Sequence, residues 1–211
     1  RAVPAHIRVR LGSLEPRTIT PEFCRRAAAL PNLCPHFHLS MQSGCDSVLA
    51  RMNRKYDSAR YYKSVKLLNE AYEAPGITTD LIVGFPGETE EEFQQTLAFI
   101  RRCAFSAMHI FPYSRRPGTP ADGMPGQILN SIKEERAHRA QQTALEMEAA
   151  YLDRWVGQTV PVLFEEERDG LWRGHTTRYS EVAAPSGEDL HNQLRQVYIT
   201  GRAGNILQGE L

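Results

Sequence analysis

The chain has 211 residues, of which 41% are hydrophobic and 24% charged, so it can bury one hydrophobic core and a smaller second one. No apolar run approaches the roughly 20 residues that a membrane helix needs, and the N-terminus lacks the basic, apolar and small-residue order of a signal peptide. These features argue against a membrane-spanning or secreted protein and predict a cytoplasmic one.

Acidic and basic residues balance overall but not along the chain. Residues 155–211 carry five arginines, no lysine and eight acids, a balance of −3, whereas residues 1–154 carry a balance of +3. RNA-binding surfaces are usually basic, so the charge gives no support for RNA binding by the C-terminal segment.

The four cysteines show no spacing typical of a metal site, because none belongs to a CxxC or CxxxCxxC motif. We expect each to be a reduced, buried thiol, and we predict no metal site from them. They are Cys24, Cys34, Cys45 and Cys103.

Residues 1–130 alternate short strand patterns with helical ones, which is typical of βα units around a parallel sheet. Helix starts are predicted after Thr20, at Asp46, near Ser58, and at a capping box formed by Thr89 and Glu92. The expected strands are residues 7–14, 37–41, 77–83 and 108–111, the first of them at a sheet edge.

A change of pattern follows a long helix predicted over residues 132–154. Beyond it, short strands are expected at 160–164, 171–176, 181–184 and 196–200, with Asp169 and Gly170 as a hairpin signal. This spacing predicts a small β-barrel. The predicted organisation is therefore a βα region over 1–130, a connecting helix over 131–154 and a β-barrel over 155–211.

Polar or strained segments follow each of the four strands of the βα region. In such an architecture the loops that leave the C-terminal ends of the strands build the functional site, so we expect these loops to share one mouth. Asp80 lies within an apolar strand, where an unpaired carboxylate would be costly. It should face the interior, either in an ion pair with an arginine such as Arg10 or in contact with a ligand, and Glu15 has the same two interpretations.

Three segments carry a family resemblance. HLSMQSG at 38–44, TDLIVGFPGET at 79–89 and PYSRRPGTPA at 112–121 resemble, in order and spacing, the strand-loop signatures of radical S-adenosylmethionine (SAM) methylthiotransferases. RVRLGSLEP at 8–16 and RMNRKY at 51–56 are similar to the branch that methylthiolates N6-threonylcarbamoyladenosine next to the tRNA anticodon. The C-terminal segment, from GQTVPVLFE at 157, is similar to a TRAM domain, a small RNA-binding barrel.

The resemblance implies an α/β fold: about four βα units of a TIM-like radical SAM barrel, followed by a TRAM barrel. It also implies SAM and 4Fe-4S clusters as cofactors, and reductive SAM cleavage that leads to insertion of a methylated sulfur at C2 of adenine. The CxxxCxxC loop that holds the cluster in this family is absent from the sequence.

The resemblance and the first residue, Arg1, together indicate that an N-terminal part of the enzyme is missing. We therefore expect this polypeptide to be inactive alone. Without its neighbouring strand, the first strand is expected to be partly exposed or to self-associate.

By the same resemblance, the cofactor-binding candidates are Gln42, Ser43, Arg54, Asp80 and Glu15. Gln42 and Ser43 follow a strand end, where they could hydrogen-bond the ribose or methionine part of SAM, and Arg54 suits its carboxylate. Loop capping by Gln42 and Ser43, and plain solvation of Arg54, are the alternatives.

The RNA-binding candidates lie in two segments. Arg115 and Arg116 suit an RNA phosphate or the threonyl carboxylate of the substrate, with solvation as the alternative. The barrel offers stacking faces and phosphate donors, although its two aromatic rings could instead belong to the barrel core. These barrel candidates are Trp172, Arg173, His175, Arg178 and Tyr179.

Two other functions remain open at this point. A ribosomal protein, the substrate of a sister branch, could replace tRNA as the substrate. The chain could also be a non-catalytic RNA-binding module that needs no cofactor.

Overall fold

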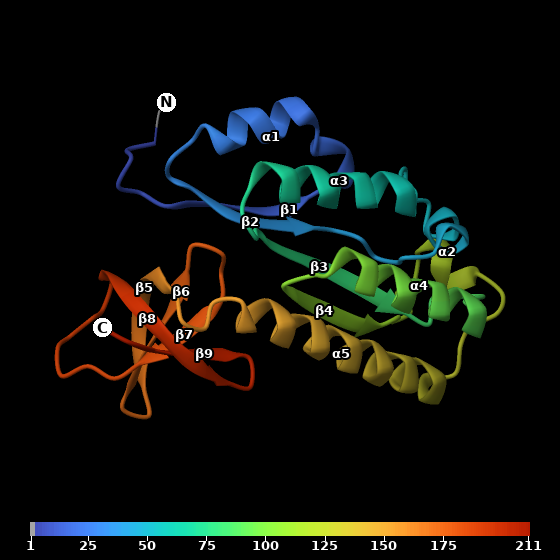
Figure 1. The fold of residues 1–211 in the computed structure, drawn as a ribbon. Coiled ribbons are helices and arrows are strands. Elements are labelled where there is room, and N and C mark those ends of the chain that lie inside the picture. The colour runs from blue at the N-terminus through green and yellow to red at the C-terminus, as the bar shows by residue number, and fades with distance from the viewer. Residues whose placement is uncertain (1–2) are drawn as a thin grey trace.

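The alternation of strands and helices produces an open parallel sheet, and residues 3–211 are described in the computed structural model. The sheet has four strands in the order β1-β2-β3-β4, all parallel, as predicted. The strands are β1 (Val9–Leu14), β2 (Leu33–Leu39), β3 (Gly76–Val83) and β4 (Ala107–Pro112). Because they are parallel, their C-terminal ends lie at one edge of the sheet (Figure 1).

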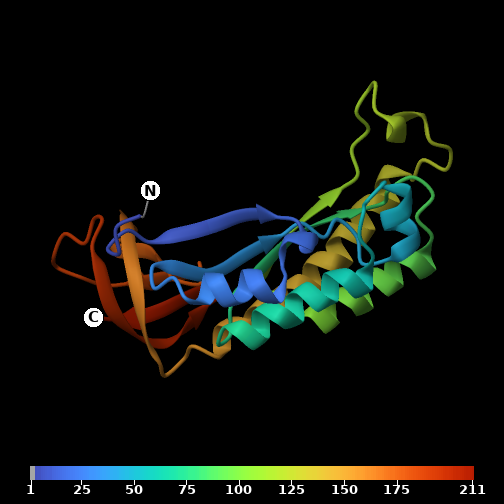
Figure 2. The same ribbon diagram turned by 90° about the horizontal axis from the view of Figure 1, so that it is seen from above.

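Helices cover one face of this sheet, and a β-barrel lies beyond the end at which the strands begin (Figures 1 and 2). None of the helices in residues 3–211 is long and apolar enough to cross a membrane. The helices are α1 (Pro21–Ala28), α2 (Asp46–Arg51), α3 (Ser58–Ala71), α4 (Glu90–Cys103) and α5 (Asn130–Asp153), with short 3-10 turns η1 (Pro16–Thr18) and η2 (Pro120–Gly123).

Local capping chemistry sets the helix starts, and the predicted starts are confirmed. The Thr20 hydroxyl accepts a hydrogen bond from the Phe23 amide at 3.1 Å. The capping box at α4 is complete, since Thr89 accepts from the Glu92 amide and Glu92 accepts from the Thr89 amide. Each bond satisfies an amide that the first helical turn would otherwise leave unpaired.

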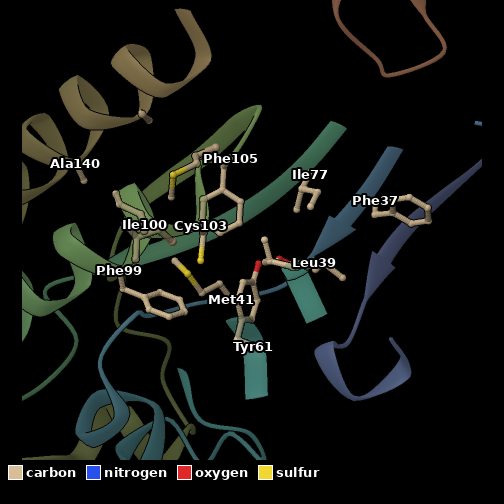
Figure 3. Close-up of a cluster of buried hydrophobic side chains, with 14 of the residues drawn as sticks. Phe37, Leu39, Met41, Tyr61, Ile77, Phe99, Ile100, Cys103, Phe105 and Ala140 are labelled. Atoms are coloured by element: carbon tan, nitrogen blue, oxygen red, sulfur yellow. The ribbon is translucent and has the colours of Figure 1, made fainter. Parts of the chain in front are cut away.

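The larger core lies between the sheet and its helices (Figure 3). Tyr61 of α3 is fully buried there, and its hydroxyl donates to the Leu39 carbonyl at 2.9 Å. All four cysteines are buried free thiols, as expected. Other members include Phe37, Met41, Ile77, Phe99, Ile100, Phe105 and Ala140.

Two strand boundaries differ from the expectation. The first strand begins at Val9, because the preceding residues form a turn in which the Ile7 amide donates to the Pro4 carbonyl. The second strand spans Leu33–Leu39 rather than 37–41, and Pro35 lies inside it. Proline lacks the amide of a regular ladder, and the β1–β2 register is irregular here.

At the edge of the sheet, β1 has no strand on its outer side within the described chain, and its residues are intermediate or exposed. The predicted edge position is confirmed. Self-association through this edge stays a prediction.

Residues 159–210 form a closed barrel in the order β5-β6-β7-β9-β8. Its strands are β5 (Thr159–Arg168), β6 (Leu171–Thr176), β7 (Glu181–Ala184), β8 (Leu194–Ala203) and β9 (Ile206–Glu210). The four-strand expectation missed β9, which closes the barrel by pairing parallel to β7 and antiparallel to β8.

Helix α5 belongs to both hydrophobic cores. Ala140 and Ala144 lie in the sheet core, whereas Tyr151 and Leu152 lie in the barrel core. The Tyr151 hydroxyl also donates to the Ala74 carbonyl at 3.0 Å, just after α3. The barrel is therefore fixed to the end of the sheet where the strands begin (Figure 1).

An ion pair joins α2 to α4. The Arg51 guanidinium lies 2.6 Å from the Glu92 carboxylate, which also accepts a hydrogen bond from Ser47. The bond from Arg51 outweighs the effect of burial and lowers the pKa of Glu92 to about 2. Ionised Glu92 thus stabilises the fold.

Replacing Gly174 by alanine should strongly destabilise the barrel. An added Cβ would overlap the Leu163 carbonyl oxygen and lie 2.7 Å from Phe164 Cα, so neighbouring backbone would have to move. We expect a loss of about 1–3 kcal/mol or more in the free energy of unfolding. Gly201→Ala is the matched control, because a Cβ there meets nothing within 4 Å. Equal stability of the two variants in denaturant unfolding would contradict this packing.

Glu92→Gln should make the free energy of unfolding less dependent on pH at acidic pH. The folded-state pKa is depressed from 4.5 to about 2, so the stabilisation is present above pH 4.5 and is lost as the pH falls towards 2. The variant should be less stable at neutral pH and lose less stability across this window. Unfolding monitored by circular dichroism at a series of pH values measures both effects. Glu91→Gln, at an exposed acid of the same turn with no ion pair within residues 3–211, should behave like the wild type.

Candidate functional site

The loop after β2, the C-terminal half of β3, and the end of β4 with its following loop enclose a cavity of about 510 Å³, which we call the mouth cavity. Its wall is mostly apolar, with a few polar groups placed among Ile82, Phe111 and Tyr113. Such a cavity is typical of a small-molecule site. The remaining lining residues are Gln42, Asp80, Pro112, Ser114, Arg116, Thr119 and Ala121.

Gln42 lines the mouth cavity, as expected, and its backbone is held firmly. It adopts a left-handed conformation with φ 70°, its amide donates to the Asp80 carbonyl, and its carbonyl accepts from the Ile82 amide, both at 2.9 Å. The residue after β2 is thereby tied to β3. No hydrogen bond of its side-chain amide is recorded within residues 3–211, so this amide is available to a ligand.

Ser43 points away from the mouth cavity. It is buried, and its hydroxyl accepts from the Cys45 amide at 3.2 Å and lies 3.4 Å from the Thr96 hydroxyl of α4. The next residue is a glycine, Gly44, because the Cβ of any other residue would lie 2.9 Å from Phe99 Cβ. Ser43 and Gly44 therefore shape the turn and pack it on α4. For Ser43 this agrees with the alternative role of loop capping.

The loop after β3 depends on the buried carboxylate of Glu88. Glu88 accepts hydrogen bonds from the Gly84 and Phe85 amides at 2.7 and 3.2 Å. Arg136 of α5 lies 3.3 Å from its carboxylate, and both side chains are buried. Burial raises the pKa of Glu88, against the opposing effects of Arg136 and the two amides.

Two residues of α5 that the sequence interpretation missed thus support the loop after β3. Arg136 holds Glu88, and the buried Lys133 packs its side chain over Gly84, which has φ 71°. Their helical spacing could have identified these two residues in the sequence, since both lie on the face of α5 that also carries the buried Ala140.

Asp80 faces the open side of the sheet, but its partner is not Arg10, so that expected ion pair is wrong. The Asp80 carboxylate lies 3.2 Å from His38 Nε2 on the neighbouring strand. Arg10 instead places its guanidinium 3.7 Å from the ring centre of Tyr179. Asp80 is therefore a partly exposed carboxylate in the mouth cavity, and His38 contacts it from the neighbouring strand.

Glu15 and Arg54 are exposed and do not line the mouth cavity. The charges of both residues influence the pKa of Tyr56. The Tyr56 hydroxyl donates to the Ser40 and Met41 carbonyls at 2.9 and 3.0 Å. Burial is the main cause that raises the pKa of Tyr56, with Arg54 opposing and Glu15 adding to it. The two candidates therefore lie near the turn after β2 rather than inside the site.

The neighbouring arginines after β4 have different surroundings. Arg115 is held by Asp122, with its Nε 2.8 Å from the carboxylate and its Nη2 2.9 Å from the carbonyl. Arg116 lines the mouth cavity and forms no ion pair within the described residues. Only Arg116 is thus available to an anion in this cavity.

The five barrel candidates divide into separate groups. Trp172 is buried in the barrel core, which is the alternative interpretation, whereas Tyr179 is 46% exposed. The Tyr179 ring stacks on His175 at 4.5 Å. Arg178 donates to the Ala74 and Glu73 carbonyls, both at 3.0 Å, and therefore ties the barrel to the sheet region. Arg173 lies 3.4 Å from Glu181.

Three of these candidates line a second cavity of about 550 Å³, the inner cavity, between the open face of the sheet and the barrel. His175, Arg178 and Tyr179 form its barrel side. The sheet region contributes Arg10, His36, His38, Thr78, His109 and Glu148.

The two implied cofactors fit this chain differently. Residues 3–211 contain no group of three or more His, Cys, Asp or Glu side chains arranged to hold a metal ion, so an iron-sulfur cluster has no ligand set here. SAM carries hydroxyl, amino and carboxylate groups. The amide of Gln42, the carboxylate of Asp80 and the guanidinium of Arg116 are suitable partners in the mouth cavity.

Comparison with known proteins agrees with this arrangement. Residues 4–100 match the Radical SAM superfamily. The tRNA-2-methylthio-N6-dimethylallyladenosine synthase of Oleidesulfovibrio alaskensis is 41% identical over 99% of this chain and 42% of its own length. The threonylcarbamoyladenosine tRNA methylthiotransferase of Bacillus subtilis is 35% identical over 91% of this chain and 44% of its own length.

A solved structure shows the same fold. Coproporphyrinogen III oxidase from Escherichia coli, a radical SAM enzyme, superposes with a TM-score of 0.57 and 13% identity, over 82% of this chain and 47% of that one. This chain spans less than half the length of the relatives described above. The matched superfamily and the identity to two methylthiotransferases show that this chain is related in sequence to part of the radical SAM methylthiotransferases.

Proposed function

We propose that this chain forms the SAM- and RNA-binding part of a tRNA methylthiotransferase that adds a methylthio group to C2 of N6-threonylcarbamoyladenosine. The observation that carries the proposal is the mouth cavity. Segments 38–44, 79–89 and 112–121, far apart in the sequence, meet there and contribute Gln42, Asp80 and Arg116. A tRNA substrate places the reaction in the cytoplasm.

In this proposal, Gln42 and Asp80 bind the hydroxyl and amino groups of SAM, and Arg116 binds an anionic group of the cofactor or of the RNA. SAM, together with a reduced 4Fe-4S cluster, supplies the radical and the methyl group for the reaction. We place the cluster ligands in an N-terminal part of the enzyme outside this chain. The greater length of the relatives supports this, and the chain alone is then inactive.

The C-terminal barrel is proposed to be a TRAM domain that contacts the anticodon stem-loop. Its five-stranded closed form supports this assignment. Arg173, His175 and Tyr179, which reach the surface, are the barrel residues that we retain as RNA contacts, whereas Trp172 and Arg178 have structural roles.

The substrate branch has a second candidate. The relative from Oleidesulfovibrio alaskensis is named for dimethylallyladenosine and is 41% identical, so this base is the alternative substrate. The relatives described above are named for tRNA, which supports tRNA over a ribosomal protein. A non-catalytic RNA-binding module is less well supported, because the mouth cavity lies on the sheet and not on the barrel.

Deletion of the gene should remove the methylthio group from N6-threonylcarbamoyladenosine in tRNA. Mass spectrometry of nucleosides from the deletion strain and its parent measures this directly. Loss from dimethylallyladenosine instead would assign the chain to the other branch. Unchanged tRNA nucleosides would overturn the tRNA function.

Arg116→Gln should weaken binding of an anticodon stem-loop and reduce the salt dependence of binding by the equivalent of about one phosphate contact. Arg115→Gln is the matched control. It should have a smaller effect, because Asp122 already holds the Arg115 guanidinium. Fluorescence anisotropy at several salt concentrations measures both variants, and equal losses would contradict the distinct roles of the two arginines.

A further inference from the structure

Four side chains form a continuous line of hydrogen bonds along the open face of the sheet. His36 and His38 of β2 lie beside Thr78 and Asp80 of β3, with His38 paired to Thr78 in the ladder. His36 Nε2 lies 3.3 Å from Thr78 Oγ1, which lies 3.1 Å from His38 Nδ1. His38 Nε2 lies 3.2 Å from the Asp80 carboxylate.

This line joins the two cavities. His36, His38 and Thr78 line the inner cavity, and Asp80 lines the mouth cavity. Neither the family signatures nor the proposed function assigns a role to His36 or Thr78.

The chemistry of the four groups gives the line a direction. An ionised carboxylate only accepts, so His38 donates through Nε2 and, as a neutral ring, accepts at Nδ1. The Thr78 hydroxyl must then donate to His38 and accept from His36 Nε2. In this assignment all three bonds are satisfied, and every donor points towards Asp80.

The same assignment explains an unpaired atom. His36 is 1% exposed, and its Nδ1 has no hydrogen-bond partner within residues 3–211. Burial, followed by the nearby Arg10 and His38, lowers the pKa of His36 to about 4, so the ring is neutral at neutral pH. With its proton on Nε2, the buried Nδ1 carries a lone pair, on a residue that lines the inner cavity.

We infer that His36, Thr78, His38 and Asp80 form a proton relay between the inner cavity and the mouth cavity, with Asp80 as the group that exchanges a proton with the ligand there. A proton accepted at His36 Nδ1 releases the Nε2 proton to Thr78. The Thr78 hydroxyl proton moves to His38 Nδ1, and the His38 Nε2 proton moves to Asp80. One proton enters, one is delivered, and no electrons are transferred.

The inner cavity sets the surroundings of the entry point. Charged and titratable groups from β1, β4, α5 and the barrel line it, and a proton enters when a water molecule or a ligand N–H or O–H group reaches the buried Nδ1 of His36. These groups are Arg10, His109, Glu148, His175, Arg178, Tyr179 and Glu181. Only the identity of the ligand at Asp80 rests on the proposed function, because the relay itself is a property of this chain.

Nitrogen-15 NMR of the histidine-labelled chain tests the relay without any ligand. We expect the ring proton of His36 and that of His38 to be on Nε2. We also expect Asp80→Asn to shift the ring-nitrogen resonances of His36 as well as those of His38. In the Thr78→Val background, the response at His36 should be lost.

Two further variants control for general damage. Thr78→Ser keeps the hydroxyl and should restore the response at His36. Thr79→Val removes a hydroxyl one residue along the strand, whose bond to the Leu39 carbonyl lies on the helix-covered side, and should leave the response intact.

A proton on Nδ1 of either ring, a doubly protonated His38, or a response at His36 that persists without the Thr78 hydroxyl would each overturn the relay. None of these results depends on SAM or RNA binding. The relay and the proposed function can therefore fail separately.

Discussion

The parallel pairing of β2, β3 and β4 is the constraint on which the rest of the structure depends. It brings three sequence segments to one edge and places Gln42 against Asp80 and Ile82. It also aligns the side chains of the open face, so that His38 meets Asp80 on the next strand. Both the mouth cavity and the line of hydrogen bonds behind it follow from this single register.

The loops at that edge keep their shape because polar groups buried beneath them are satisfied. Glu88 accepts from two loop amides and is paired with Arg136, and Ser43 accepts from the next turn. A buried carboxylate that loses its partner is strongly destabilising, so such a network permits few alternative loop conformations. Gln42, whose side chain is left for a ligand, directly precedes the Ser43 that packs this turn on α4.

The sequence predicted what local chemistry decides. Thr20 and Thr89 start helices through bonds to residues three positions away, and these were identified correctly. The order of the βα region and the edge position of β1 also follow from pattern alone.

Features that depend on distant partners were not predictable in this way. The choice of His38 over Arg10 as the partner of Asp80 depends on strand register, and the difference between Arg115 and Arg116 depends on where η2 places Asp122. Trp172 and Tyr179 looked alike in the sequence, yet one lies on the inward side of β6 and the other in the turn after it. Strand β9 was missed because its role is to close a barrel, a property of five segments together.

Helix α5 fixes the position of the barrel relative to the sheet. Its 24 residues span about 36 Å as one uninterrupted rod, anchored in the sheet core at Ala140 and in the barrel core at Leu152. A single inserted residue would turn the barrel by about 100° and advance it by about 1.5 Å. The number of residues in α5 therefore sets the distance and the orientation of the barrel relative to the mouth cavity.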